Sequence, residues 1–241
     1  MSTLFYDDDL AYIHDVGFGS FANGVAPELI QILQDAEIDD GLIVDVGCGS
    51  GILARHLTKA GYDVLGIDVS PAMIARARAK APPAKFQVGS LFTAKLPTCR
   101  AITALGEVVC YRADTGRDRL ASWFRRATKA LMPGGLLIFD VVELGVDRDR
   151  PPSFRAGPDW ACLVRCEYDS RRNQLIRHIT SFRKVGELYR RSEESHRVQL
   201  YQPADIATML RKHGFEVSMV RSIGQFPLLP GRAGFIARLA D

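Results

Sequence analysis

The sequence has little excess charge and no long apolar run. Its 241 residues include 31 basic and 28 acidic side chains, so the formal net charge is only +3. Such a balance gives no strong attraction to nucleic acid or to an anionic membrane. No apolar stretch approaches the ~20 residues of a membrane span, and the first ten residues contain three aspartates in place of a basic secretion signal. We therefore expect a soluble, cytoplasmic protein without nucleic-acid or membrane partners.

Cysteine is scarce and odd in number, which argues against a disulfide framework. Cys162 and Cys166 lie in a strand-like stretch without a second Cys or His pair, so we expect no metal site. Reduced thiols in a reducing compartment are the expected state. The five cysteines are Cys48, Cys99, Cys110, Cys162 and Cys166.

Strand-like and helix-like segments alternate from residue 28 onward. This alternation predicts a doubly wound α/β fold, in which crossover helices cover both faces of a parallel sheet. The expected strands cover 42–46, 64–67, 85–88, 101–105, 136–141, 215–220 and 235–239. The expected helices cover 27–36, 52–60, 71–80, 117–131 and 202–213, and Pro133-Gly134-Gly135 is expected to form a turn.

Over residues 144–200 a different residue pattern interrupts this alternation of strands and helices. A polar segment with two prolines, 147–152, leaves the sheet, and alternating stretches follow at 162–168, 174–182 and 188–200. Turn signals at 169–173 and Gly186 separate them. We predict an antiparallel cap inserted after the fifth strand, with residues 1–143 and 201–241 forming the core.

The strongest chemical signal is a glycine-rich loop between a strand and a helix. It reads Asp45-Val46-Gly47-Cys48-Gly49-Ser50-Gly51. Glycines allow positive φ and a close ligand approach, and the helix that follows offers free amides. Asp68 ends the next strand, where a carboxylate can accept hydrogen bonds from both ribose hydroxyls. Together these features predict a nucleotide-like ligand.

Glycine spacing discriminates between nucleotides. A dinucleotide fingerprint has G-x-G-x-x-G, whereas this loop has G-x-G-x-G and Ile52 follows it. Asp45, two residues before the first glycine, suits a ligand with an ammonium group. The loop with Asp68 resembles class I S-adenosylmethionine-dependent methyltransferases, as do the stretches 89–91, 104–107 and 131–135. The resemblance implies a Rossmann-like sheet of order 3-2-1-4-5-7-6 with strand seven antiparallel.

The resemblance also implies S-adenosylmethionine as cofactor and a set of contacts to it. The glycine loop would hold the methionine part with Asp45 near its ammonium, and Asp68 would hold the ribose. The residues after strands two and three would contact adenine, with Ser90 at a position where many family members have Asp. The implied cofactor residues are Tyr12, Asp45, Gly47, Cys48, Gly49, Gly51, Asp68, Val69, Met73, Ser90, Leu91 and Gly106.

The N-terminal stretch also resembles a segment of small-molecule methyltransferases that closes over the methionine end of the cofactor. Tyr12 would then reach the cofactor carboxylate. The alternative interpretation is that Tyr12, Phe18 and Phe21 merely pack a leading helix against the sheet.

The acceptor is expected between the strand-four tip and the cap. Glu107 follows Gly106 at the carboxyl edge of the sheet, where open α/β folds bind ligands. Glu107 could orient an amine or accept its proton, whereas Tyr111 and His196 are placed only by their proximity to the pocket mouth. His196 could act as a base near neutral pH, although a solvated histidine in a charged strand has the same sequence appearance.

A small molecule is the favoured acceptor, methylated on nitrogen or oxygen. Strand four lacks the Pro-Pro-aromatic tip of base-modifying enzymes, and no basic patch accompanies the fold. Two alternatives remain at this point: an NAD-dependent oxidoreductase, and a non-catalytic protein that binds S-adenosylmethionine or S-adenosylhomocysteine. The sequence indicates neither the acceptor nor the oligomeric state.

Overall fold

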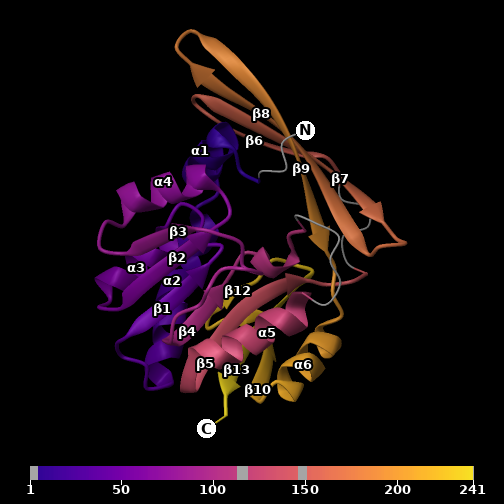
Figure 1. The fold of residues 1–241 in the computed structure, drawn as a ribbon. Helices are drawn as coiled ribbons and strands as arrows, with labels where there is room; N and C mark the ends of the chain where they lie inside the picture. Colours follow the sequence, from indigo (N-terminus) through magenta and orange to yellow (C-terminus); the bar gives the residue numbers. More distant parts are fainter. Residues whose placement is uncertain (1–4, 113–118, 146–150, 241) are drawn as a thin grey trace.

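A seven-stranded sheet lies at the centre of the computed structural model, which describes residues 5–112, 119–145 and 151–240. Strand β13 runs antiparallel to both of its neighbours, and the other pairs are parallel. The predicted order 3-2-1-4-5-7-6 is therefore confirmed (Figure 1). From edge to edge the strands are β3 (Lys85–Val88), β2 (Asp63–Asp68), β1 (Leu42–Val46), β4 (Cys99–Ala104), β5 (Leu131–Val142), β13 (Arg232–Leu239) and β10 (Phe215–Val220).

Helices cover both faces of this sheet. Alternate residues of β1, such as Ile43 and Val44, belong to two separate buried clusters, because successive side chains of a strand point to opposite faces. One cluster contains Trp123 of α5 and Leu210 of α6, and the other contains Leu29 of α2. The helices are α1 (Asp8–Gly17), α2 (Ser20–Asp35), α3 (Ile52–Lys59), α4 (Pro71–Lys80), α5 (Arg119–Ala130) and α6 (Pro203–Lys212), with a short 3-10 helix η1 (Val108–Cys110).

The largest differences from the predicted boundaries are at the starts of helix α2 and strand β5. Helix α2 begins at Ser20 rather than at Pro27, which lies inside it. An interior proline removes one helical hydrogen bond, but Val25 and Ala26 before it are fully buried and keep the helix continuous. Strand β5 begins at Leu131, so the expected turn at 133–135 lies within it, where the pairing register with β4 shifts.

The predicted cap region forms a separate four-stranded antiparallel sheet, here called the cap sheet. Its strands are β6 (Ser153–Gly157), β7 (Trp160–Asp169), β8 (Gln174–Val185) and β9 (Leu188–Gln199). Sequence alternation missed β6, because nearly all of its residues are exposed. It also missed the short hairpin β11 (Ser222–Ile223) and β12 (Phe226–Pro227). The expected polar exit at 147–150 and the expected helix start at 117–118 lie outside the described residues.

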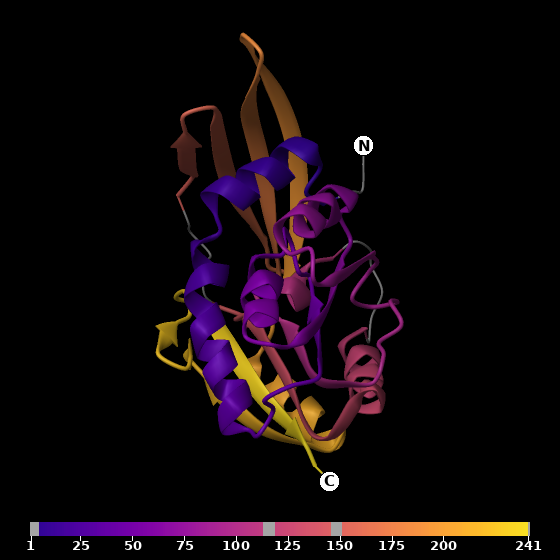
Figure 2. The same cartoon turned by 90° about the vertical axis from the view of Figure 1, so that its left-hand side faces the viewer.

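Helix α1 joins the cap sheet to the rest of the molecule. Leu10 and Ile13 of α1 are buried against Trp160, Cys162 and Ile179 of the cap sheet. Figure 2 shows α1 lying across the cap strands. The cap sheet reaches the carboxyl end of β4 through an isolated bridge between Tyr111 and Val198. In the described part of the chain, no helix combines the length and apolarity needed to cross a membrane.

Candidate active site

The glycine loop turns the chain sharply from β1 into α3. The amides of Gly47 and Cys48 both donate to the carbonyl of Ile67, at 2.7 and 3.2 Å, and hold the loop against β2. Gly49 has φ of +52°. A Cβ placed on Gly49 would have no neighbour within 4 Å among the described residues, whereas one on Gly47 would lie 2.4 Å from Val108. The loop therefore leaves open space beside Gly49 that a side chain would fill.

Asp68 ends β2 directly beside this loop. Its Oδ2 accepts a hydrogen bond from the Gly49 amide and its Oδ1 one from the Ser70 amide, each at 2.9 Å. Burial raises the pKa of the Asp68 carboxyl, and the backbone donors oppose this effect. Each carboxylate oxygen has a second lone pair, so Asp68 retains acceptor capacity for two ribose hydroxyls.

Asp45 lies buried at the end of β1. Its Oδ1 accepts a hydrogen bond from the Thr103 hydroxyl at 2.8 Å, and its Oδ2 has no hydrogen-bond partner among the described residues. Burial, assisted by the charge of Asp68 and opposed by Thr103, raises the pKa of Asp45 to about 7. A buried acceptor without a partner is costly. The orphaned oxygen and the space beside Gly49 fit a ligand with an ammonium group, as the methionine end of the predicted cofactor requires.

The predicted adenine contacts follow β2 and β3. Val69 is 38% exposed, whereas Met73 and Leu91 are buried. The Ser90 hydroxyl accepts a hydrogen bond from the Phe92 amide at 3.2 Å, which leaves its own proton free to donate to a ligand. These contacts stay predictions.

The tip of β4 has a strained backbone. Gly106 and Glu107 both have positive φ, +90° and +60°, and such a conformation is uncommon for a residue other than glycine. Both amides donate to Oδ1 of Asp140, at 2.6 and 3.0 Å. Strained backbone of this kind clusters at functional sites. Here it turns the Glu107 side chain toward the cap sheet.

Glu107, Asp140, Arg177 and Arg232 form one buried ion cluster between core and cap. Glu107 Oε2 accepts from Arg177 and from Arg232, each at 3.0 Å, and Arg232 also reaches Asp140 at 3.1 Å. Burial opposes the charge of Glu107, but Arg177 and Arg232 outweigh it and lower the pKa of Glu107 to about 2. Glu107 is therefore a weak proton acceptor in this arrangement.

Two tyrosines extend the cluster. The Tyr111 hydroxyl donates to Glu107 Oε1 at 3.4 Å and lies 3.0 Å from the hydroxyl of Tyr6. Burial, with the nearby Glu107 charge, raises the pKa of Tyr111 to about 12. Tyr111 thus remains a neutral hydroxyl that can donate to, or accept from, a bound molecule.

His196 lies at the same place, contributed by β9. It is 1% exposed, so the alternative of a solvated histidine does not apply. Its ring packs against Phe5, Tyr6 and Tyr111, with ring centroids 5.0, 5.0 and 5.7 Å away. The structure therefore brings together Glu107, Tyr111 and His196, the three predicted catalytic candidates.

Tyr12 is engaged differently. Its hydroxyl donates to Asp159 at 2.6 Å, and the Arg183 guanidinium lies 4.0 Å from the centre of its ring. A contact with the cofactor carboxylate would require the bond to Asp159 to break. Phe18 packs against Trp160 of the cap sheet and Phe21 against Phe226.

Several residues of the site carry no sequence signal. Arg177 and Arg232 come from strands far apart in the chain, and only the fold brings them to Glu107. Arg177 lies in the expected alternating stretch 174–182, whereas Arg232 precedes the expected strand 235–239. The aromatic residues of the N-terminal stretch gave a signal, but that signal pointed to Tyr12 rather than to Tyr6.

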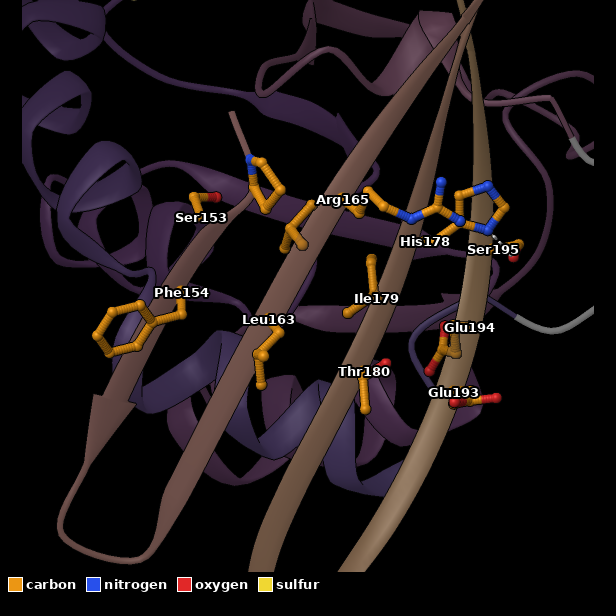
Figure 3. Close-up of a pocket in the computed structure, with 12 residues that line it drawn as sticks. Ser153, Phe154, Leu163, Arg165, His178, Ile179, Thr180, Glu193, Glu194 and Ser195 are labelled. Atoms are coloured by element: carbon orange, nitrogen blue, oxygen red, sulfur yellow. Dashed lines mark hydrogen bonds between the residues drawn. The ribbon is translucent and has the colours of Figure 1, made fainter. Parts of the chain in front are cut away.

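A groove of about 510 Å³ lies on the opposite, solvent side of the cap sheet. Figure 3 shows Phe154, Leu163, Thr180 and Glu193 in a row across the four strands. Phe154 and Leu163 are 77% and 46% exposed. Because side chains alternate along a strand, this face is distinct from the one that carries Arg177.

Comparison with known proteins agrees with the glycine loop and the fold. Residues 43–135 match a family model described as a methyltransferase domain. A putative methyltransferase of Geobacillus sp. strain WCH70 is 29% identical over 189 residues, covering 73% of this chain and 74% of that protein. A dTDP-3-amino-3,6-dideoxy-alpha-D-glucopyranose N,N-dimethyltransferase of Streptomyces fradiae is 24% identical, covering 95% of this chain and 94% of that protein. The structure of the sugar N-methyltransferase KedS8 from Streptoalloteichus sp. has a TM-score of 0.80 at 22% identity, covering 100% of this chain and 98% of that chain.

The fold, the loop and the family match together define the class, a Rossmann-like methyltransferase that uses S-adenosylmethionine. Residues 43–135 match the methyltransferase-domain model, and the loop and sheet order are those expected for a class I S-adenosylmethionine-dependent methyltransferase.

Proposed function

We propose that this enzyme methylates a nitrogen or oxygen of a small molecule that binds between the β4 tip and the cap sheet. The observation that carries the proposal is the convergence of Glu107, Tyr111 and His196 at the carboxyl edge of the sheet that also presents Asp68. Ligands of open α/β sheets bind outside these strand ends. Relatives named as sugar N-methyltransferases support a small-molecule acceptor.

The chain's own residues would hold the cofactor. We propose that Asp68 accepts hydrogen bonds from the ribose hydroxyls and that the orphaned Oδ2 of Asp45 accepts one from the ammonium group. The space beside Gly49 would take the methionine part. Val69, Met73, Ser90 and Leu91 would line the adenine. When bound, S-adenosylmethionine supplies a methyl group already activated on a sulfonium.

Because the methyl group is already activated, positioning of the acceptor is a main task of the protein. Aligning two reactants in a dry pocket can contribute roughly 7–11 kcal/mol. The buried ion cluster gives the acceptor pocket a rigid polar wall, and Tyr111 adds a neutral hydroxyl. Glu107, charged through its two arginines, would orient a donor on the acceptor rather than remove its proton.

The predicted compartment, partners and domain division of the enzyme are also proposals. All five cysteines are free, which supports a reducing, cytoplasmic compartment. The small net charge supports the absence of a nucleic-acid partner. We further propose that residues 144–200 form the acceptor-binding cap, with residues 1–143 and 201–241 as the core.

A panel assay tests this proposal. Radiolabelled S-adenosylmethionine is supplied with nucleotide-linked amino sugars, free amino sugars, amino acids, other amines and phenols, and mass spectrometry locates the methylated atom. We expect label in at least one nitrogen or oxygen acceptor. Tight binding of S-adenosylhomocysteine without transfer to any panel member would instead support a non-catalytic binding protein.

A further inference from the structure

Glu194 and His196 lie on the same face of β9. They are two residues apart, so both side chains point from the cap sheet toward the core. The side chain of Glu194 is 10% exposed and that of His196 is 1% exposed. Glu193, the residue directly before Glu194, points to the other face, and its side chain is 62% exposed.

The carboxylate of Glu194 holds the imidazole in one orientation. Its Oε2 lies 2.8 Å from His196 Nε2 and also accepts from the Tyr6 amide at 2.8 Å. Its Oε1 accepts from the Asp7 amide at 2.9 Å. An ionised carboxylate only accepts hydrogen bonds, so Nε2 of His196 must carry the proton that it shares with Glu194. In the neutral ring, Nδ1 is then the basic atom.

Nδ1 of His196 is buried and has no hydrogen-bond partner among the described residues. A buried polar atom without a partner calls for an explanation. Nδ1 belongs to the imidazole that Phe5, Tyr6 and Tyr111 enclose. A proton donor on a bound acceptor molecule would satisfy it.

Tyr6 links this pair to the predicted cofactor site. Its amide donates to Glu194, and its carbonyl accepts from the Ser70 hydroxyl at 2.7 Å. Ser70 in turn donates its amide to Asp68. Tyr6 therefore connects the Glu194–His196 pair, through Ser70, to the end of β2 that is proposed to hold the ribose.

Among the described residues, few titratable or charged groups face His196. Glu194 is on its own strand, Tyr6 and Tyr111 approach from the N-terminal stretch and the β4 tip, and His14 lies on α1 beyond Tyr6. Burial lowers the pKa of His14 to about 4, so His14 is neutral at working pH. The buried ion cluster lies behind Tyr111. Glu194 is thus the anion placed to balance a charge on His196.

We propose that Glu194 is a positioning residue that fixes His196 with Nε2 protonated and Nδ1 ready to take a proton from the methyl acceptor. This inference rests on the proposed function. As the acceptor's nitrogen or oxygen bonds to the methyl carbon, the electron pair of the broken carbon–sulfur bond stays on sulfur. The proton of the acceptor atom passes to Nδ1, and Glu194 balances the resulting imidazolium charge.

Nitrogen-15 NMR of the labelled protein shows which nitrogen of His196 carries the proton, and it needs no substrate. The signal is assigned to His196 by its absence from the H196N variant. We expect the Nε2-protonated tautomer in wild type and loss of that preference in E194Q. An Nδ1-protonated wild-type ring would overturn the proposal even if E194Q did not fold. E193Q is the matched control, because it removes the neighbouring carboxylate from the opposite face, and it should leave the tautomer unchanged.

Steady-state kinetics with the acceptor provide a second, independent test. In E194Q we expect kcat to fall by on the order of 10²-fold, the lower range for a lost general base, while KM for the acceptor and the Kd for S-adenosylhomocysteine change by less than about threefold. E193Q should match wild type in kcat. Wild-type kcat in E194Q would overturn the positioning role but leave the proposed function intact. Absence of transfer by wild type would refute the proposed function, while the tautomer result would still stand.

Discussion

Arg177 of the cap sheet and Glu107 of the β4 tip form a buried ion pair, with Arg177 Nη2 3.0 Å from Glu107 Oε2. This contact fastens the cap to the carboxyl edge of the main sheet. It also fixes the charge of Glu107, because Arg177 and Arg232 outweigh burial and hold its pKa near 2. The predicted acceptor site is therefore built from both sheets.

Replacing Glu107 by glutamine should destabilise the fold. The change leaves two mostly buried guanidinium groups facing a neutral amide, and breaking a buried ion pair in this way costs about 3–5 kcal/mol. Urea unfolding at pH 7 measures the difference. D169N is the control, because Asp169 pairs with Arg172, whose side chain is 74% exposed, and a surface pair contributes about 1 kcal/mol or less. Equal effects of the two changes would contradict the role of the cluster.

The same cluster predicts a stability change in acid. The pKa of Glu107 in the folded protein, about 2, lies below its ordinary value of 4.5. The stabilisation is therefore complete above about pH 4.5 and is lost as the pH falls toward 2. Unfolding free energies of wild type and E107Q should converge over that range. A constant difference between them would contradict the assignment.

Asp68→Ala should weaken cofactor binding. The change removes acceptors for two ribose hydroxyls, and charge-assisted hydrogen bonds contribute about 1.5–3 kcal/mol, which corresponds to roughly tenfold to several hundredfold in Kd. Calorimetry with S-adenosylhomocysteine measures the loss. D63A is the matched control, because Asp63 is an exposed aspartate at the other end of the same strand. An unchanged Kd in a folded D68A protein would refute the assignment.

Gly49→Val should abolish cofactor binding and leave the fold largely intact. Gly49 has positive φ, and its missing side chain leaves open space on the ligand side. Gly61→Val is the control, because Gly61 also has positive φ and open surroundings but lies at the end of α3. The two variants carry similar backbone strain, so circular dichroism should show similar folds, and calorimetry should show binding only in G61V. Normal binding by G49V would mean that the loop is merely a tight turn.

The core of the fold could be predicted from the sequence, because the residue patterns that specify its strands, helix caps and turns are local. Val44 and Ile67 sit in short apolar strands, Ser70 caps α4 through the Met73 amide, and the glycine loop requires positive φ. The prediction that a helix starts at Pro27 was wrong, because the buried residues before Pro27 extend α2 back to Ser20. Strand β6 lacked alternation because it lies at the exposed edge of the cap sheet.

The side chains around the proposed acceptor site could be predicted from the sequence only in part. Glu107 followed from its place at the end of β4, and His196 from its place in the expected cap. The ionic partners of Glu107 depend on how the cap sheet packs on the core, which no spacing in the chain encodes. The basicity that the sequence allowed for Glu107 was removed by those same partners.

The proposed methyl transfer is tested most directly by measuring the amounts of both products formed by wild type and E107A with the acceptor found by the panel. We expect wild type to form methylated acceptor and S-adenosylhomocysteine in equal amounts. E107A should keep the wild-type Kd for S-adenosylhomocysteine and lose most of kcat/KM. Consumption of S-adenosylmethionine without methylated acceptor, or wild-type kcat/KM in a folded E107A protein, would contradict it.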